Sequence, residues 1–113
     1  MQLEAKTYLY DIARAGDLIA EFTAGKTFSG YKADPMLRAA VERQFEIIGE
    51  ALSKLAKQHE DIASRITEHG RIIAFRNILI HGYADIDDRL VWDIVETKLP
   101  VLRLEVTRLL ADS

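Results

Sequence analysis

Apolar residues recur at intervals of three and four positions along most of the chain, which is the spacing of helices that bury one face. The first such stretch covers about residues 3–24, and Gly25 is expected to end it. A second helix is expected to open at Asp34-Pro35, because Asp is a favoured N-cap and Pro fits the first helical position. The two buried stripes comprise Ala5, Leu9, Ile12, Gly16, Ile19 and Ala20, then Leu37, Val41, Gln44, Phe45, Ile48, Leu52 and Leu55.

The second half of the chain predicts a short helical turn and two longer helices. After a loop over residues 26–31 and the second helix, the short turn starts at Asp61. A third helix covers about residues 70–81, and a fourth covers about residues 88–111, with Pro100 expected to kink it. Their apolar sides comprise Ile72, Phe75, Ile78 and Leu79, then Val91, Ile94, Val95, Val101, Leu102, Leu104 and Leu109.

The pattern therefore predicts an all-α fold, since no segment has the alternating pattern of a strand. Short connections between amphipathic helices favour an antiparallel helical bundle of about four main helices, formed by residues 1–113 as a single domain. Gly49 interrupts the second helix at a cost of about 1 kcal/mol relative to alanine. A close approach of another helix would justify this glycine.

The composition narrows the class of protein. The chain has 113 residues, no cysteine, and no apolar run near the roughly 20 residues of a membrane span. Its charged start, residues 1–6, does not resemble a signal peptide, so we expect a soluble cytoplasmic protein with no membrane partner. The 15 Lys and Arg against 18 Asp and Glu give a formal charge of −3. That balance speaks against a general DNA-coating protein, and contact with RNA would need a local basic site.

Three histidines are the candidates for acid–base chemistry. His59 and His69 fall in polar connecting segments, and we interpret both as solvent-exposed side chains. No His-x-x-x-His or Glu-x-x-His pair occurs within the predicted helices, so neither a metal nor another cofactor is expected. His81 differs from the other two because it ends an apolar helix next to Gly82, with Arg76 and Asn77 just before it.

The spacing of these residues places Asn77 and His81 on one face of the helix, four positions apart. Arg76 and His81 are five positions apart, which is roughly 140° around an ideal helix. The two side chains can therefore reach one ligand only in three ways. The long arginine side chain extends around the helix, the helix end is distorted, or the second side chain comes from another copy of the chain. The offset is one reason to expect a site shared by two chains.

Histidine and arginine together fit the chemistry of phosphodiester cleavage. Histidine exchanges a proton near neutral pH, and arginine offers a permanent forked charge to a phosphate. Asn77 could orient the histidine or donate to a phosphate oxygen, and the 2′-hydroxyl of RNA can serve as the nucleophile without a metal. The competing interpretation is structural, because basic residues at the C-terminal end of a helix also stabilise the helix dipole.

An acidic ridge runs along the second helix through Glu42, Glu46 and Glu50. For Glu42 and Glu46 we favour a solvated face paired with Arg38 and Lys54. Glu50 lies next to Gly49, so it is a candidate to approach the third helix and pair with Arg76 as a supporting residue of the site.

The stretch over residues 76–83, Arg-Asn-Ile-Leu-Ile-His-Gly-Tyr, resembles the Arg-x4-His-x-Tyr signature of HepT-like proteins, a branch of the HEPN superfamily. The Ile-Gly-Glu-Ala of residues 48–51 and the Val-Trp of residues 91–92 are similar to other parts of the family's pattern. The likeness covers about residues 3–110. It departs at the start of the third helix, where His69-Gly70-Arg71 stands in place of the proline that members often carry.

This resemblance implies a HEPN-like bundle that forms a homodimer, with both copies of the motif lining one cleft. It implies a metal-independent endoribonuclease, the toxin of a toxin–antitoxin pair, in which Arg76 stabilises the phosphate and His81 carries the proton. It also implies a cognate minimal nucleotidyltransferase as antitoxin, which transfers AMP to Tyr83. RNA is then the substrate, and DNA is not expected.

Two other functions compete with this one. A non-catalytic HEPN module would bind nucleotides or a partner nucleotidyltransferase without cleaving RNA. A purely structural helical dimer would do neither. RNA cleavage in EDTA, and its loss on replacement of His81, distinguish the leading hypothesis from both.

Overall fold

The computed structural model describes residues 1–82 and 85–112, and the secondary structure within these ranges is entirely helical. The all-α prediction is therefore confirmed. No helix in this part of the chain combines the length and the hydropathy needed to cross a membrane. The helices are α1 (Leu3–Thr23), α2 (Phe28–Ala33), α3 (Pro35–Gln58), α4 (Glu60–Ala63), α5 (His69–Gly82), α6 (Asp88–Thr97) and α7 (Leu99–Ala111).

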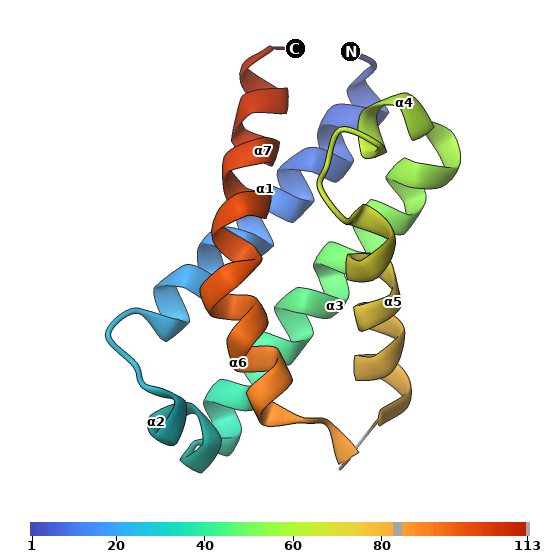
Figure 1. Cartoon of the computed structure of the whole chain (residues 1–113). Coiled ribbons are helices and arrows are strands. Elements are labelled where there is room, and N and C mark those ends of the chain that lie inside the picture. The colour runs from blue at the N-terminus through green and yellow to red at the C-terminus, as the bar shows by residue number, and fades with distance from the viewer. Residues whose placement is uncertain (83–84, 113) are drawn as a thin grey trace.

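The long helices form an antiparallel bundle around α3 (Figure 1). α1 packs along α3 and also against α7, while α5 packs along another side of α3. Successive long helices run in opposite directions, and the last turn of α5 lies at the end of the bundle away from both termini (Figure 1). The bundle measures 42 × 28 × 19 Å.

Side-chain caps explain where several helices begin. The carboxylate of Asp34 accepts hydrogen bonds from the backbone N–H groups of Met36 and Leu37, both at 3.1 Å, so the predicted start of α3 is confirmed. Thr27 caps α2 in the same way through the N–H of Gly30. The sequence predicts a loop over residues 26–31, and the structure shows that the second half of this segment forms the start of α2 instead.

The fourth predicted helix is two helices, α6 and α7, separated at Lys98. The prediction of one helix kinked at Pro100 is wrong in this respect. Pro100 lies in the first turn of α7, where its missing N–H removes no helical hydrogen bond. The break lets α6 contact α2 while α7 continues along α1.

A continuous apolar core joins the helices. Leu9, Ile12, Leu52 and Val106 are among its most buried members. Two aromatic contacts connect neighbouring helices: the rings of Tyr31 and Trp92 are 5.3 Å apart, and those of Phe45 and Phe75 are 5.4 Å apart. Three residues that the pattern assigned to buried faces are instead exposed: Ile78, Val101 and Leu104.

Candidate functional site

The candidate residues lie on the last two turns of α5. Asn77 and His81 are exposed, as expected for residues four apart on one face, and Arg76 is half-buried on another side of the helix. Tyr83, the expected site of modification, lies outside the described residues. The structure therefore presents the arginine and the histidine on one helix but on different sides of it.

Arg76 is held by its packing on α3. Its stem lies directly against Gly49, so close that a Cβ built on Gly49 would be 2.3 Å from the Cβ of Arg76 and 2.7 Å from its Cγ. The close helix approach expected at Gly49 is thus confirmed. The Nη1 of Arg76 donates to the Oδ1 of Asn77 at 3.4 Å, while its Nε is buried without a hydrogen-bond partner.

Neither Arg76 nor His81 forms an ion pair with the described residues. The side chain of His81 likewise makes no hydrogen bond within this part of the chain. A permanent positive charge and an imidazole are consequently both open to a ligand, which suits a phosphate and a transferable proton.

The acidic ridge behaves as a solvated face at Glu46 and Glu50. The carboxylate of Glu50 pairs with Lys54 at 3.5 Å, and that of Glu46 pairs with Arg43 at 3.4 Å. A pairing of Glu50 with Arg76 is therefore not what the structure shows. Lys54 lies one helical turn after Glu50 on α3, so the two can form an ion pair at the surface. A pair with Arg76 would instead require the carboxylate to lose part of its hydration.

Glu42 is the member of the ridge with a perturbed environment. Burial, followed by the nearby carboxylate of Asp88, raises its pKa, and the guanidinium of Arg38 opposes that shift. Arg38 also lies 4.0 Å from Asp88. Asp88 belongs to the first turn of α6, so these groups lie where the start of that helix meets α3.

The other two histidines lie away from the motif. His69 is half-buried at the start of α5, with its Nε2 4.0 Å from the carboxylate of Glu60. His59 has a side chain only 14% exposed, 3.5 Å from Glu4 of α1, so its interpretation as a solvent-exposed residue is wrong. The start of α1 covers it. The described residues contain no group of His, Asp and Glu able to hold a metal.

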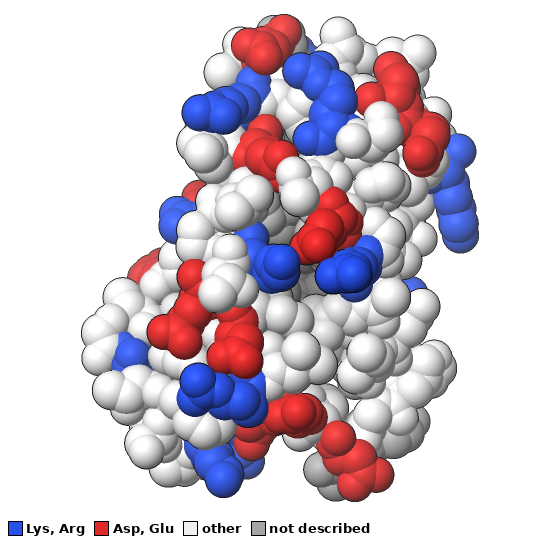
Figure 2. All heavy atoms as spheres, viewed as in Figure 1, with Lys and Arg blue, Asp and Glu red and all other residues white. Residues whose placement is uncertain are grey.

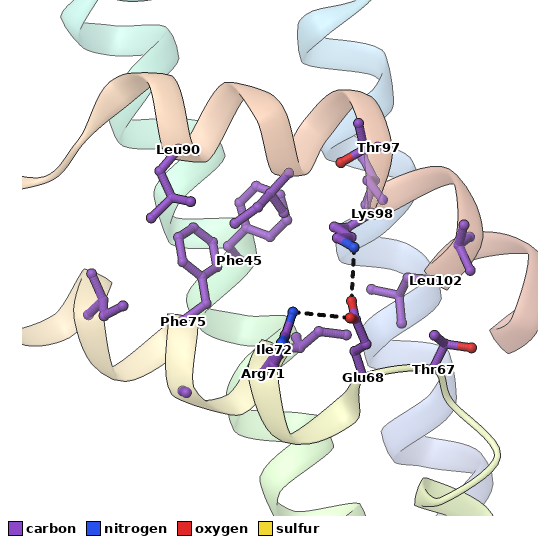
Figure 3. A pocket seen from close by; sticks show the side chains of 15 residues that line it. Phe45, Thr67, Glu68, Arg71, Ile72, Phe75, Leu90, Thr97, Lys98 and Leu102 are labelled. Carbon is purple, nitrogen blue, oxygen red and sulfur yellow. Dashed lines mark hydrogen bonds and ion pairs between the residues drawn. The ribbon is translucent and has the colours of Figure 1, made fainter.

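A groove that the sequence did not predict runs between α5 and the α6–α7 segment (Figure 3). It encloses about 490 Å³, and most of its lining is apolar. Phe45 and Phe75 lie at its base, with Leu90 of α6 facing them (Figure 3). Ile78, next to Asn77 in the motif, lines it as well and is 50% exposed. The groove thus borders the candidate site along the same helix.

A small ion-pair network marks the opposite end of the groove from the motif. The carboxylate of Glu68 lies 3.2 Å from Arg71 and 3.0 Å from Lys98 (Figure 3). The hydrogen bond from Lys98 is the main reason that the pKa of Glu68 is lowered. Two cations share one carboxylate here, so this end of the groove keeps a net positive charge, with both cations held by Glu68.

Charges of both signs are interspersed on the face shown in Figure 2, and uncharged side chains cover the lower right, where α5 runs. This face has no broad basic surface of the kind that coats nucleic acid. An apolar area beside Arg76, which has no ion-pair partner among the described residues, fits a local site next to a protein contact.

An all-α bundle that exposes an Arg-x4-His motif at the end of one helix defines the class of HEPN-like domains. The family model described as "Ribonuclease HepT-like" matches residues 12–109 of this chain. The chain belongs to the HepT-like ribonuclease family, which confirms the resemblance noted in the sequence.

Curated relatives agree with this assignment. The chain is 35% identical over 103 residues to "Probable ribonuclease HepT" of Thermococcus cleftensis, covering 91% of this chain and 93% of that protein. It is 34% identical over 103 residues to "Putative RNase MJ1380" of Methanocaldococcus jannaschii, covering 91% and 94%. It is 30% identical over 105 residues to "Putative RNase TTE0752" of Caldanaerobacter subterraneus, covering 93% of each. No solved structure matches the chain. The family and these names support ribonuclease activity.

Proposed function

We propose that this chain is a metal-independent endoribonuclease whose active site combines Arg76 and His81 from two copies of the chain. The observation that carries the proposal is the end of α5, which offers an exposed histidine and an arginine without an ion-pair partner among the described residues. Membership of the HepT-like family supports RNA as the substrate. We place residues 1–113 in the cytoplasm, acting as one domain.

The proposed reaction needs only groups that RNA and the chain supply. The 2′-oxygen attacks the adjacent phosphorus, and the bond from phosphorus to the 5′-oxygen breaks, leaving a cyclic phosphate and a 5′-hydroxyl. One His81 accepts the proton of the 2′-hydroxyl, and the His81 of the second copy donates a proton to the 5′-oxygen. Arg76 stabilises the growing negative charge on the phosphate, and Asn77 steadies its guanidinium. DNA lacks the 2′-hydroxyl and is not a substrate.

The second copy is part of the proposal because one chain separates its two key side chains. Arg76 and His81 project roughly 140° apart on α5. The apolar groove beside α5 gives a second copy a surface to pack on, and exposed Ile78 and Val101 lie along it. Burying that surface would bring a second motif next to the first, so we propose the homodimer as the active species.

The proposed physiological role is that of a toxin neutralised by a minimal nucleotidyltransferase antitoxin. This part rests on the resemblance of the motif, in which Tyr83 is the residue that receives AMP. Each added nucleotidyl group brings bulk and negative charge two residues from His81. A bound RNA phosphate would be repelled there, which makes the modification a sensible means of inactivation.

The decisive test is RNA cleavage by the purified chain in the presence of EDTA. Wild-type protein should cleave, and His81→Ala should lower kcat by at least about 100-fold, since it removes both the general base and the general acid. His69→Ala is the matched control: it changes the same residue type on the same helix, away from the motif, and should leave kcat unchanged.

Two results would overturn the proposal. One is wild-type activity that EDTA abolishes and a divalent cation restores. The other is equal cleavage by His81→Ala and wild type. A chain that cleaves no RNA yet forms a stable complex with a nucleotidyltransferase, or binds a nucleotide, would instead be the non-catalytic binding module.

A further inference from the structure

Gly49 lies at a close approach of α3 and α5, and the residue it faces is Arg76. A Cβ at position 49 would stand 2.3 Å from the Cβ, 2.7 Å from the Cγ and 3.3 Å from the Cδ of Arg76. The first of these atoms is fixed by the backbone of α5, so no rotation of the arginine relieves the clash. Any side chain at position 49 therefore forces α5 away from α3.

This contact also restricts the arginine itself. With its stem flat against the backbone of α3, Arg76 has its Nε buried and its Nη1 next to Asn77 at 3.4 Å. A guanidinium confined in this way loses little further freedom on binding a ligand. A displacement of about 1 Å at such a group can cost a factor of about 100 in rate.

A second glycine–arginine contact in the same bundle differs from the contact of Gly49 with Arg76 in two respects: the atom that is crowded and the partner of the guanidinium. Gly16 of α1 faces Arg103 of α7, and a Cβ on Gly16 would be 3.2 Å from the Cγ of Arg103, a flexible part of the stem. The guanidinium of Arg103 pairs with Asp17 through Nη2 at 2.9 Å and Nε at 3.2 Å. Arg103 is thus neutralised within the chain. Arg76 has no carboxylate partner among the described residues.

We propose that Gly49 is a positioning residue for the active site: by admitting the stem of Arg76 against α3, it sets where the guanidinium meets a phosphodiester. A glycine at this position lowers the stability of the helix by about 1 kcal/mol relative to alanine. It also leaves room for the arginine to be ordered before the substrate binds. The inference rests on the proposed ribonuclease function for its effect on catalysis, but the contact with Arg76 can be tested without any activity.

The experiment compares Gly49→Ala with Gly16→Ala and Gly70→Ala in the full chain, at a temperature where circular dichroism shows all three folded. A Cβ on Gly70 would have no neighbour within 4 Å, so that variant controls for the alanine alone. Gly16→Ala controls for crowding an arginine elsewhere. Gly49→Ala should lower kcat by at least about tenfold with KM nearly unchanged, because the lost interaction belongs to the transition state. Both controls should keep the wild-type kcat.

A second readout follows the Nε–Hε signal of Arg76 by NMR during titration with inorganic phosphate. In wild type this proton should exchange slowly with water and shift on adding phosphate, unlike the signals of exposed Arg71 and Arg89. In Gly49→Ala it should exchange faster and respond more weakly. The measurement on wild type alone keeps the inference testable if Gly49→Ala does not fold.

The outcomes separate the two proposals. Slow exchange and a phosphate response in a chain that cleaves no RNA would sink the ribonuclease and leave the role of Gly49 standing. A folded Gly49→Ala with wild-type kcat and an unchanged Arg76 signal would overturn the positioning role. A wild-type Arg76 proton that exchanges as fast as those of Arg71 and Arg89 would overturn it too.

Discussion

α1 and α5 both have an apolar side, but the bundle buries that side to different extents. α1 lies between α3 and α7, and the buried residues of its stripe, such as Leu9 and Ile12, are at most 1% exposed. α5 packs mainly along α3 and buries Phe75 and Leu79, while Ile78 remains 50% exposed. The chain therefore buries the apolar side of α1 and only part of the apolar side of α5.

The difference indicates that the pattern of α5 serves two purposes. Phe75 and Leu79 hold the helix to the core, and the side that carries Ile78 borders both the groove and the exposed Asn77. An apolar groove with exposed residues such as Ile78 and Val101, next to the candidate site, is typical of a contact surface. Two experiments would break or sharpen this comparison, and a third concerns the acidic ridge on α3.

The largest expected effect is on stability. Leu9→Ala should lower the free energy of unfolding by about 2–5 kcal/mol, because it leaves a cavity in a fully packed part of the core. Ile78→Ala should change the stability of the monomer by no more than about 0.5 kcal/mol. Urea unfolding at low protein concentration measures both. Equal losses in the two variants would mean that α5 is as firmly covered as α1.

The second effect is on self-association. Ile78→Asp places a charge on the surface that we propose a second copy covers, so the protein should become monomeric in light scattering and lose RNA cleavage. Met36→Asp is the matched control, since Met36 is 82% exposed and lies on α3 outside the groove. A dimer that survives Ile78→Asp would place the interface elsewhere.

The smallest effect concerns pH and the ridge on α3. Because the pKa of Glu42 is raised in the folded state, the folded protein binds this proton more tightly than the unfolded chain does. The free energy of unfolding therefore falls as the pH rises from 4.5 through the folded pKa, and it stays lower at neutral pH.

Glu42→Gln should accordingly stabilise the protein at neutral pH, by under about 1 kcal/mol for a partly solvated group, and the gain should vanish below pH 4.5. Thermal unfolding at several pH values measures this. Glu46→Gln removes a carboxylate from the same ridge that pairs with Arg43, and it should give no gain at neutral pH. A gain from Glu42→Gln that persists in acid would contradict the assigned cause.

Much of the fold was predictable because local signals coincide with tertiary contacts. Asp34-Pro35 starts α3 by capping chemistry that needs no neighbour, and the spacing of Leu9 and Ile12 matches the face that α3 covers. The break at Lys98 was not predictable in the same way. A proline inside an apolar pattern is compatible with a kink or with a new helix, and the packing of α6 on α2 decides between them.

The sequence names the candidate site residues but not their geometry. The motif of α5 names Arg76 and His81, and the glycine at position 49 signals a close contact. Which atoms meet at Gly49, and that Glu50 prefers Lys54, depend on the relative placement of two helices. The groove combines residues from α3, α5, α6 and α7, and no single stretch of sequence carries that signal beyond apolar residues left exposed.

The break at Lys98 also divides the last part of the chain into two helices, for which the packing predicts unequal local stability. α7 packs along α1, whereas α6 packs less extensively, against α2 and α7, and its contacts include Trp92 against Tyr31. Segments with fewer buried contacts open at a lower free energy, so the amides of α6 should exchange with deuterium faster than those of α1. Of the helices that line the groove, α6 is therefore the one that we expect to move away from α5 most readily, whereas the contact of Gly49 with Arg76 joins α3 to α5.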